Sequence, residues 1–330
     1  MKSSETYGKY IITVKGPMEK SQFGFCHGHD HLFIENGQSF LINPVNPALR
    51  MDEPEKTIQE LVLFKEAGGQ SIIDAQPLGC GRMEKELLAA SQTTGVNIVA
   101  STGFHKLDFY PEHHWIYSTG EEKLSEVFTG ELTEGMLEDT NRHFPSHRMT
   151  AKAGVIKAAS GADGISGTYQ KLFSAAAIAA KETGAPVLTH LEMGEGAFEQ
   201  VEFFTQRGVE PNAIILSHLD RKIGDMTYHR EVAETGVFLE FDTIGRFKYH
   251  SDEEEASYIV KMVEYGFEDK ILLGLDSTRE RMKSYGGSIG LDYLLKRFIP
   301  LLKSYGLSEE IIAKLTIQNP ANAFSNRKLL

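Results

Sequence analysis

Short apolar runs alternate with longer stretches of helical periodicity along most of the chain. Eight apolar runs recur from residue 22 onward: Gln22–Cys26, Ser71–Ala75, Val96–Ser101, Gly154–Ala158, Pro186–His190, Ala213–His218, Val237–Phe241 and Ile271–Leu275. Most are continuous rather than alternating, which is typical of strands buried on both faces of a parallel sheet. Amphipathic stretches between them predict helices at Lys56–Ala67, Arg82–Thr94, Gln170–Thr183, Glu199–Arg207, Thr227–Thr235 and Glu253–Tyr265.

This alternation predicts an α/β fold in which eight parallel strands close into a (β/α)8 TIM barrel, because crossovers between parallel strands are right-handed. A doubly wound open sheet is the alternative. That fold usually carries a glycine-rich phosphate-binding turn after its first strand, and this sequence has none there. We expect residues 1–330 to form a single domain, with a short lead-in that contains a hairpin near Gly16-Pro17.

One connection is longer than a normal crossover. Residues 105–150, after the third predicted strand, include an amphipathic pattern made by Leu124, Val127, Phe128, Leu132, Met136 and Leu137. Long connections inside compact domains are commonly functional. We therefore expect a helical excursion here that helps to shape or cover the site.

Composition narrows the classes of function. The chain has 330 residues, 41% hydrophobic and 24% charged, with a formal net charge of −12, which argues against nucleic-acid binding or adhesion to anionic membranes. No apolar run approaches the ~20 residues of a membrane span, and the N-terminus does not resemble a signal peptide. Cys26 and Cys80 are the two cysteines. We expect both to be small buried apolar residues in a cytoplasmic protein without a disulfide framework.

Polar residues of metal-ligand type stand at the ends of five predicted strands: His29 and His31, Lys157, His190, His218 and Asp276. Taken singly, an inward histidine is more often a hydrogen-bonded core residue, and Asp276 could cap the following helix. Lys157 differs, because a buried ammonium must lose its charge, find partners or be modified. Active sites of barrels form at the C-terminal ends of the strands, so the joint pattern predicts one shared site.

This constellation resembles the phosphotriesterase family of the amidohydrolase superfamily, from GHDHL through IKAAS, LTH, LSH and GLDS to TIQNPANAF. The resemblance implies that His29, His31 and Asp276 hold one divalent metal and that His190 and His218 hold a second. It also implies that Lys157, carboxylated by carbon dioxide, bridges the two ions. Zinc suits imidazole and oxygen ligands best, and manganese, cobalt or iron could substitute.

The resemblance further implies a mechanism of ester hydrolysis. A hydroxide bridging two metals ~3.5–4 Å apart would be the nucleophile, and the metals would polarise the scissile bond. Asp276 would take the proton of the hydroxide and pass it to the leaving oxygen. His27 does not match the His-x-His motif, so we expect it to be structural or to support a ligand rather than to bind metal.

Basic residues concentrate in the last three strand-end loops although the protein is acidic overall. The candidates for substrate binding are Lys222, Arg246 and Arg279, with Tyr285 as an accessory donor. Barrel enzymes often bind phosphate in these loops, so the cluster suggests an anionic, phosphorylated small molecule. Ion pairs with Asp225, Asp242 or Glu280 would explain the same residues without a ligand.

Lactones are a recurring natural substrate class in the family that the chain resembles. Combined with the basic loops, this gives the hypothesis of a phosphorylated sugar lactone opened to its acid. The alternatives are a phosphotriesterase or general carboxylesterase acting on uncharged substrates, a lyase that forms a Schiff base at Lys157, and a barrel without catalytic activity. The resemblance also makes a homodimer an expectation.

Overall fold

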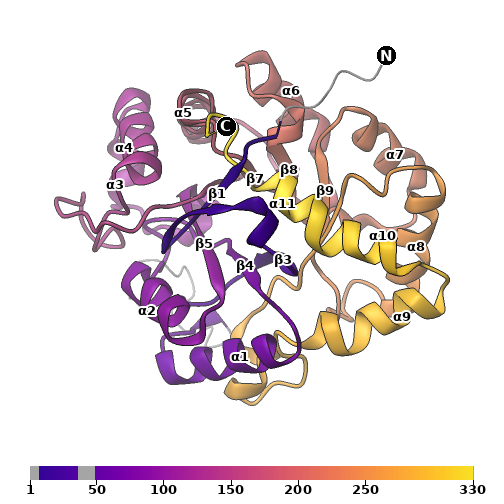
Figure 1. The fold of residues 1–330 in the computed structure, drawn as a ribbon. Coiled ribbons are helices and arrows are strands. Elements are labelled where there is room, and N and C mark those ends of the chain that lie inside the picture. Colours follow the sequence, from indigo (N-terminus) through magenta and orange to yellow (C-terminus); the bar gives the residue numbers. More distant parts are fainter. Residues whose placement is uncertain (1–6, 36–48, 330) are drawn as a thin grey trace.

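A computed structural model describes residues 7–35 and 49–329 of the chain. Eight parallel strands form a barrel with helices around it (Figure 1), in the order β10-β9-β8-β7-β6-β5-β4-β3. Their bounds are β3 Cys26–Asp30, β4 Ser71–Asp74, β5 Asn97–Phe104, β6 Val155–Ala159, β7 Val187–His190, β8 Ile214–Leu216, β9 Phe238–Phe241 and β10 Ile271–Leu273. The seam closes where the backbone amides of Leu275 and Asp276 donate to the carbonyl oxygen of His29 at 3.3 and 3.0 Å. The predicted (β/α)8 barrel is confirmed.

Helices follow the strands and surround the barrel. Their bounds are α1 Pro54–Glu66, α2 Glu84–Thr94, α3 Trp115–Ser118, α4 Glu121–Thr133, α5 Thr168–Thr183, α6 Ala197–Gln206, α7 Met226–Glu234, α8 Asp252–Glu264, α9 Ile299–Ser304, α10 Glu309–Ala313 and α11 Asn319–Ala323. Helices α2 and α5 end at Gly95 and Gly184, whose left-handed φ angles of 72° and 76° suit a glycine C-cap. No helix within residues 7–35 and 49–329 has the length and apolar character that a bilayer crossing requires.

The N-terminal end of the barrel is filled by apolar side chains. The predicted hairpin forms from β1 Tyr10–Thr13 and β2 Gly16–Glu19, and the amide of Val14 donates to the carbonyl oxygen of Ile98 at 2.9 Å. Ile11, from this hairpin, joins one buried cluster with Phe23 and with residues from the barrel strands. Because this end is packed with hydrocarbon, polar chemistry is confined to the opposite, C-terminal end.

The first strand was predicted in the wrong place. Residues Lys20–Gln22 form a 3-10 turn, and the strand is Cys26–Asp30 rather than Gln22–Cys26. A hydrophobic pattern does not reveal this strand because it is Cys-His-Gly-His-Asp, yet all five residues are buried. Inside the fold His27 pairs with Asp30 and His29 with Ser217, and the strand pairs in parallel with β4. His29 therefore lies within the strand, and His31 follows it.

The long connection after the third strand contains the ordinary crossover helix. Helix α4 packs beside α5, and the unusual length comes from short turns before α4 and an irregular return after it, where Leu137 pairs with Arg148. The start of the connection reaches the cavity described below, since His105, Lys106 and Phe109 line it. The expectation that this segment helps to shape the site therefore applies to its first few residues.

A buried ion pair anchors this connection to the barrel. Arg82, which is 2% exposed, donates from Nη2 to Oε1 of Glu131 at 2.6 Å and from Nη1 to Oε2 at 2.8 Å. Arg82 also donates to the carbonyl oxygen of Ser101, and Glu131 accepts from the amide of Leu137 at 2.7 Å. The pair thus joins β5, α4 and the irregular return.

Replacing Glu131 by alanine should lower the free energy of unfolding by about 3–5 kcal/mol, because the buried Arg82 guanidinium loses its bidentate partner and keeps the longer contact with Glu84 at 3.8 Å. Chemical denaturation followed by circular dichroism measures the change. Glu134→Ala, at the exposed end of the same helix, is the matched control. A destabilisation no larger than that of the control would contradict the anchoring role.

Candidate metal centre

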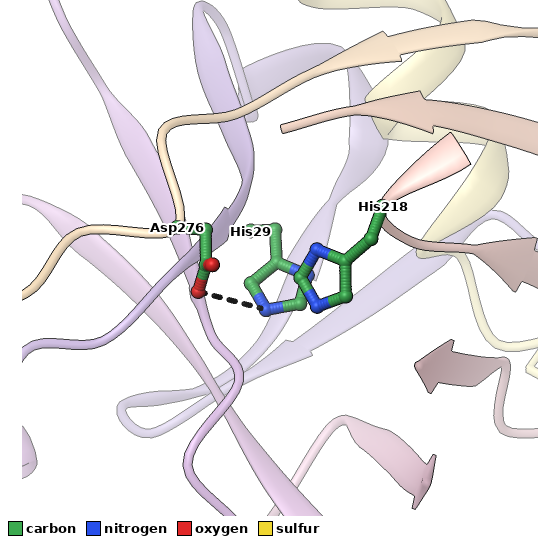
Figure 2. Close-up of side chains that lie close together, drawn as sticks. All are labelled: His29, His218 and Asp276. Carbon is green, nitrogen blue, oxygen red and sulfur yellow. Dashed lines mark ion pairs between the residues drawn. The ribbon is translucent and has the colours of Figure 1, made fainter. Parts of the chain in front are cut away.

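The six predicted ligands come together at the C-terminal end of the barrel. Figure 2 shows His29, His218 and Asp276 converging, and one ligand atom from each lies within 4.8 Å of the others. The Oδ1 atom of Asp276 is 3.8 Å from Nε2 of His29 and 3.4 Å from Nε2 of His31. The ends of the first and last barrel strands therefore bring the side chains of His29, His31 and Asp276 close together.

The two histidines from later strands lie against this group. His190 is the last residue of β7, and His218 follows β8. The ring centroid of His218 is 4.5 Å from that of His190 and 4.9 Å from that of His29. Nε2 of His190 lies 3.3 Å from Oε2 of Glu192, which leaves Nδ1 as the nitrogen free to bind a ligand.

Lys157 lies on the floor between these groups. It is the middle residue of β6 and is fully buried, with Nζ 3.4 Å from Nε2 of His29 and 3.3 Å from the carbonyl oxygen of Thr189. Burial lowers the pKa of this amine to about 8, although Glu240 and neighbouring carboxylates oppose the effect. A larger fraction of the amine is therefore neutral near pH 7 than for an exposed lysine, and the neutral amine is the form that reacts with carbon dioxide.

Two of the ligand-type residues hold uncommon backbone conformations. His218 and Asp276 have φ angles of 66° and 47°, in the left-handed region that side-chain-bearing residues rarely adopt. Hydrogen bonds hold both in place: the amide of His218 donates to Oδ2 of Asp242 at 3.2 Å, and that of Asp276 donates to the His29 carbonyl. Strained backbone maintained in this way is characteristic of functional sites.

Two carboxylates, Glu240 in β9 and Asp242 directly after it, orient the imidazoles, a role that the sequence pattern does not predict. The Nδ1 atom of His29 lies 3.2 Å from Oε2 of Glu240 and 3.1 Å from Oδ2 of Asp242. Nδ1 of His218 lies 2.7 Å from Oδ1 of Asp242. A carboxylate that accepts from Nδ1–H directs Nε2 outward and makes it a better ligand. The available signal was the pair of acidic residues in the otherwise apolar segment FLEFD, residues 238–242.

The two carboxylate oxygens of Asp276 face different groups. Its Oδ1 atom faces the histidines, whereas Oδ2 lies 2.9 Å from Nη2 of Arg221 and 3.2 Å from Nη2 of Arg246. Burial alone would raise the pKa of Asp276, but the charge of Arg246, the hydrogen bond with His31 and the charge of Arg221 hold it well below its usual value. The carboxylate is therefore ionised in the resting protein.

A cavity of about 260 Å³ opens above these groups. Four of the predicted ligands line it: His31, His190, His218 and Asp276. Three cationic side chains, Lys106, Arg221 and Arg246, line it as well. Nζ of Lys106 lies 2.8 Å from Oε2 of Glu192, which links the loop after β5 to the loop after β7.

The four predicted substrate-binding residues lie in different surroundings. Arg246 lines the cavity, whereas Lys222, Arg279 and Tyr285 do not belong to the lining found in the described residues. Lys222 pairs with Glu195 at 3.1 Å. Arg279 pairs with Glu53 at 2.6 Å and lies over the ring of Tyr285, whose hydroxyl donates to the carbonyl oxygen of Glu53. That Lys222, Arg279 and Tyr285 bind substrate stays a prediction.

His27 and the cysteines lie outside the ligand group. Nδ1 of His27 is 2.6 Å from Oδ2 of Asp30, and its ring packs edge-on against Phe64 at 4.8 Å, as expected of a structural residue. Cys26 and Cys80 are free and buried, which confirms their predicted state. The cavity is also lined by Arg221, His105 and Lys106, for which the sequence pattern predicts no specific role.

Comparison with known proteins decides the family. Residues 9–324 match the sequence profile of the Phosphotriesterase family. The chain belongs to the phosphotriesterase family. It is 33% identical over 322 residues to a phospho-furanose lactonase of Mycoplasmopsis synoviae (strain 53), covering 94% of this chain and 90% of the relative.

Solved structures of family members have the same fold. A lactonase from Listeria monocytogenes superposes with a TM-score of 0.88 at 30% identity, covering 97% of this chain and 100% of that one. The phosphotriesterase homology protein of Escherichia coli, solved with phosphate in its active site, superposes with a TM-score of 0.81 at 27% identity, covering 92% and 99%. Family members are metal-dependent hydrolases of ester bonds, so this chain is an ester hydrolase, and its His29–His218–Asp276 group could hold a metal.

Proposed function

We propose that this member of the phosphotriesterase family is a lactonase that opens a phosphorylated sugar lactone to its acid. The observation that carries the proposal is the environment of Asp276. This carboxylate faces imidazoles through one oxygen and two guanidinium groups through the other, at the base of a small cavity. Such a cavity would place the hydrolytic centre directly beside two guanidinium groups, those of Arg221 and Arg246, that can bind an anion.

The donor set fits two divalent ions, with zinc the best match to imidazole nitrogen and carboxylate oxygen. His29, His31 and Asp276 would hold one ion, and His190 and His218 the other. Lys157, as a carbamate, would bridge them, and its buried position beside His29 suits that role. When bound, the ions supply a hydroxide nucleophile at neutral pH and polarise the lactone carbonyl.

Asp276 would move the proton. Its ionised Oδ1 faces the histidines and accepts the proton that is released as the carbonyl carbon gains its new oxygen. The bond between that carbon and the ring oxygen then breaks, and the proton passes to the ring oxygen, which leaves as a hydroxyl. Arg221 and Arg246 cannot take the proton, because a guanidinium does not deprotonate in proteins. They keep Asp276 ionised and ready to accept again.

The size and charge of the cavity support a small anionic lactone. A volume of about 260 Å³ lies below the usual range for drug-sized ligands and suits a single sugar ring better than a bulky triester. Lys106, Arg221 and Arg246 face two acidic lining residues, Glu192 and Asp276, so positive charge is in excess. The relative named phospho-furanose lactonase and the phosphate in the Escherichia coli structure support the same substrate class.

A panel of sugar lactones, each with and without a phosphate, tests the substrate. We expect kcat/KM to be about 10- to 150-fold higher with the phosphate, the effect of one or two hydrogen bonds to charged groups. Equal or faster hydrolysis of the phosphate-free lactones would contradict the proposal and favour an esterase for uncharged substrates.

Kinetics of the Arg246→Gln variant distinguish two roles of Arg246: binding the phosphate of the substrate and pairing with the Asp276 carboxylate. Both substrates should slow, because Arg246 contacts Asp276, but the preference for the phosphorylated lactone should also fall towards unity. Arg297→Gln, on the exposed face of the C-terminal helices, is the matched control and should change neither quantity. An unchanged preference in the Arg246 variant would show that other residues bind the anion. The remaining candidates are Lys106 and Arg221 in the cavity lining, and Lys222, Arg279 and Tyr285 outside it.

A further inference from the structure

A second group of ligand-type side chains is buried outside the centre described above. Asp220, His250 and Glu255 each offer one ligand atom within 4.8 Å of the others. They come from the turn after β8, the loop after β9 and the first turns of α8. Asp220 and Glu255 are fully buried and His250 is 7% exposed, and the proposed reaction uses none of them.

The carboxylates of this group are only partly hydrogen-bonded: Oδ2 of Asp220 accepts from the amide of Thr243, but three other oxygens lack such a partner among the described residues. Both oxygens of Glu255 and Oδ1 of Asp220 are buried without a hydrogen-bond partner in the described part of the chain. Burial and the proximity of Asp220 raise the pKa of Glu255 well above its usual value. Two buried carboxylates facing each other are unfavourable unless a cation or a proton lies between them.

The contacts of His250 favour a cation. Its Nε2 atom lies 3.1 Å from Oγ1 of Thr243, a normal hydrogen bond that leaves Nδ1 as the ligand atom. Nδ1 is 3.4 Å from Oε2 of Glu255 and 3.3 Å from the carbonyl oxygen of Ser251, both longer than a usual N–H···O bond. Ligand atoms on a tetrahedral zinc, with bonds of about 2.0–2.1 Å, lie about 3.3–3.4 Å from each other.

We propose that Asp220, His250 and Glu255 bind a divalent transition-metal ion, with zinc the best fit to one nitrogen and several oxygens. The two carboxylates neutralise its charge in the interior. The ligands are inaccessible to solvent, so the ion is structural rather than catalytic. It joins the loop that carries His218 to the loop that carries Arg246.

Crystals of the metal-loaded protein test the site without any substitution. Anomalous diffraction at the absorption edge of the bound metal should give a peak between Oδ1 of Asp220, Nδ1 of His250 and the Glu255 carboxylate. A peak at His29, His218 and Asp276 with none at the second group would overturn the proposal.

Glu255→Gln distinguishes a metal from a shared proton, because glutamine copies the shape of a protonated glutamate but is a poor ligand. We expect one metal ion fewer per chain by mass spectrometry, together with a lower Tm. Glu253→Gln, exposed on the same helix, should change neither. Wild-type metal content and Tm in the Glu255 variant would show that a proton suffices. His250→Gln gives the same readout if the first variant does not fold.

Discussion

Lys157→Ala should reduce kcat by about 10³-fold or more, since a metal pair contributes several kcal/mol to such reactions and the carbamate is its proposed bridge. Metal content per chain should fall as well. Adding acetate or propionate to the variant should restore part of both, because a small carboxylate can occupy the space of the missing side chain and bridge the ions. Steady-state kinetics with and without the added acid, alongside metal analysis, measures these effects.

The rescue distinguishes a bridging role from a structural one. Removing a fully buried side chain also leaves a cavity, which would lower stability and activity for an ordinary packing reason. Short acids would not correct that defect in a concentration-dependent way at constant Tm. Lys181→Ala, exposed on α5, controls for loss of a lysine. Full activity in the Lys157 variant, or activity lost without any rescue, would contradict the bridge.

Asp276→Asn should reduce kcat by about 10²- to 10⁴-fold, the range for loss of a general base. Asparagine preserves the shape of the side chain but cannot accept the proton, and it leaves Arg221 and Arg246 without their shared counter-charge. The substitution should affect all lactones alike, so the preference for the phosphorylated substrates should persist. Initial-rate measurements on the same lactone panel give both numbers.

Loss of metal is the competing explanation for that result, because Asp276 is also a predicted ligand. Metal content measured on the same sample separates the two, since a variant that keeps its metal and still loses kcat has lost the proton acceptor. Asp269→Asn, at an exposed position before β10, is the control. A variant with near-normal kcat would rule out the proton-transfer role.

The apolar strands were predictable from the sequence because a strand that is buried on both faces has a continuous run of hydrophobic residues. The segments around Lys157 and His190 were placed correctly in this way. The first strand was misplaced because its buried residues include polar ones, and some of these form hydrogen bonds with partners distant in the sequence. His29, for example, lies within hydrogen-bond distance of Ser217. Hydrophobicity alone cannot reveal such compensation.

The residues that orient the predicted ligands could not be predicted from the sequence pattern either. Asp242 holds His218 across two adjacent strands, and no spacing rule within one strand encodes that contact. Arg246 and Arg279 look equivalent in the sequence because each follows a strand end. Loop paths separate them: Arg246 turns into the cavity, whereas Arg279 pairs with Glu53 at the start of α1.

The barrel seam joins the first and last strands of the barrel, β3 and β10, at the place where His29 and Asp276 meet. During synthesis His29 leaves the ribosome early, but its partner is made only after most of the chain has emerged. A nascent chain that lacks β10 therefore cannot assemble the first ligand group. If this group binds the proposed metal, loading would follow completion of the barrel, and an unfinished chain would lack the proposed hydrolytic centre.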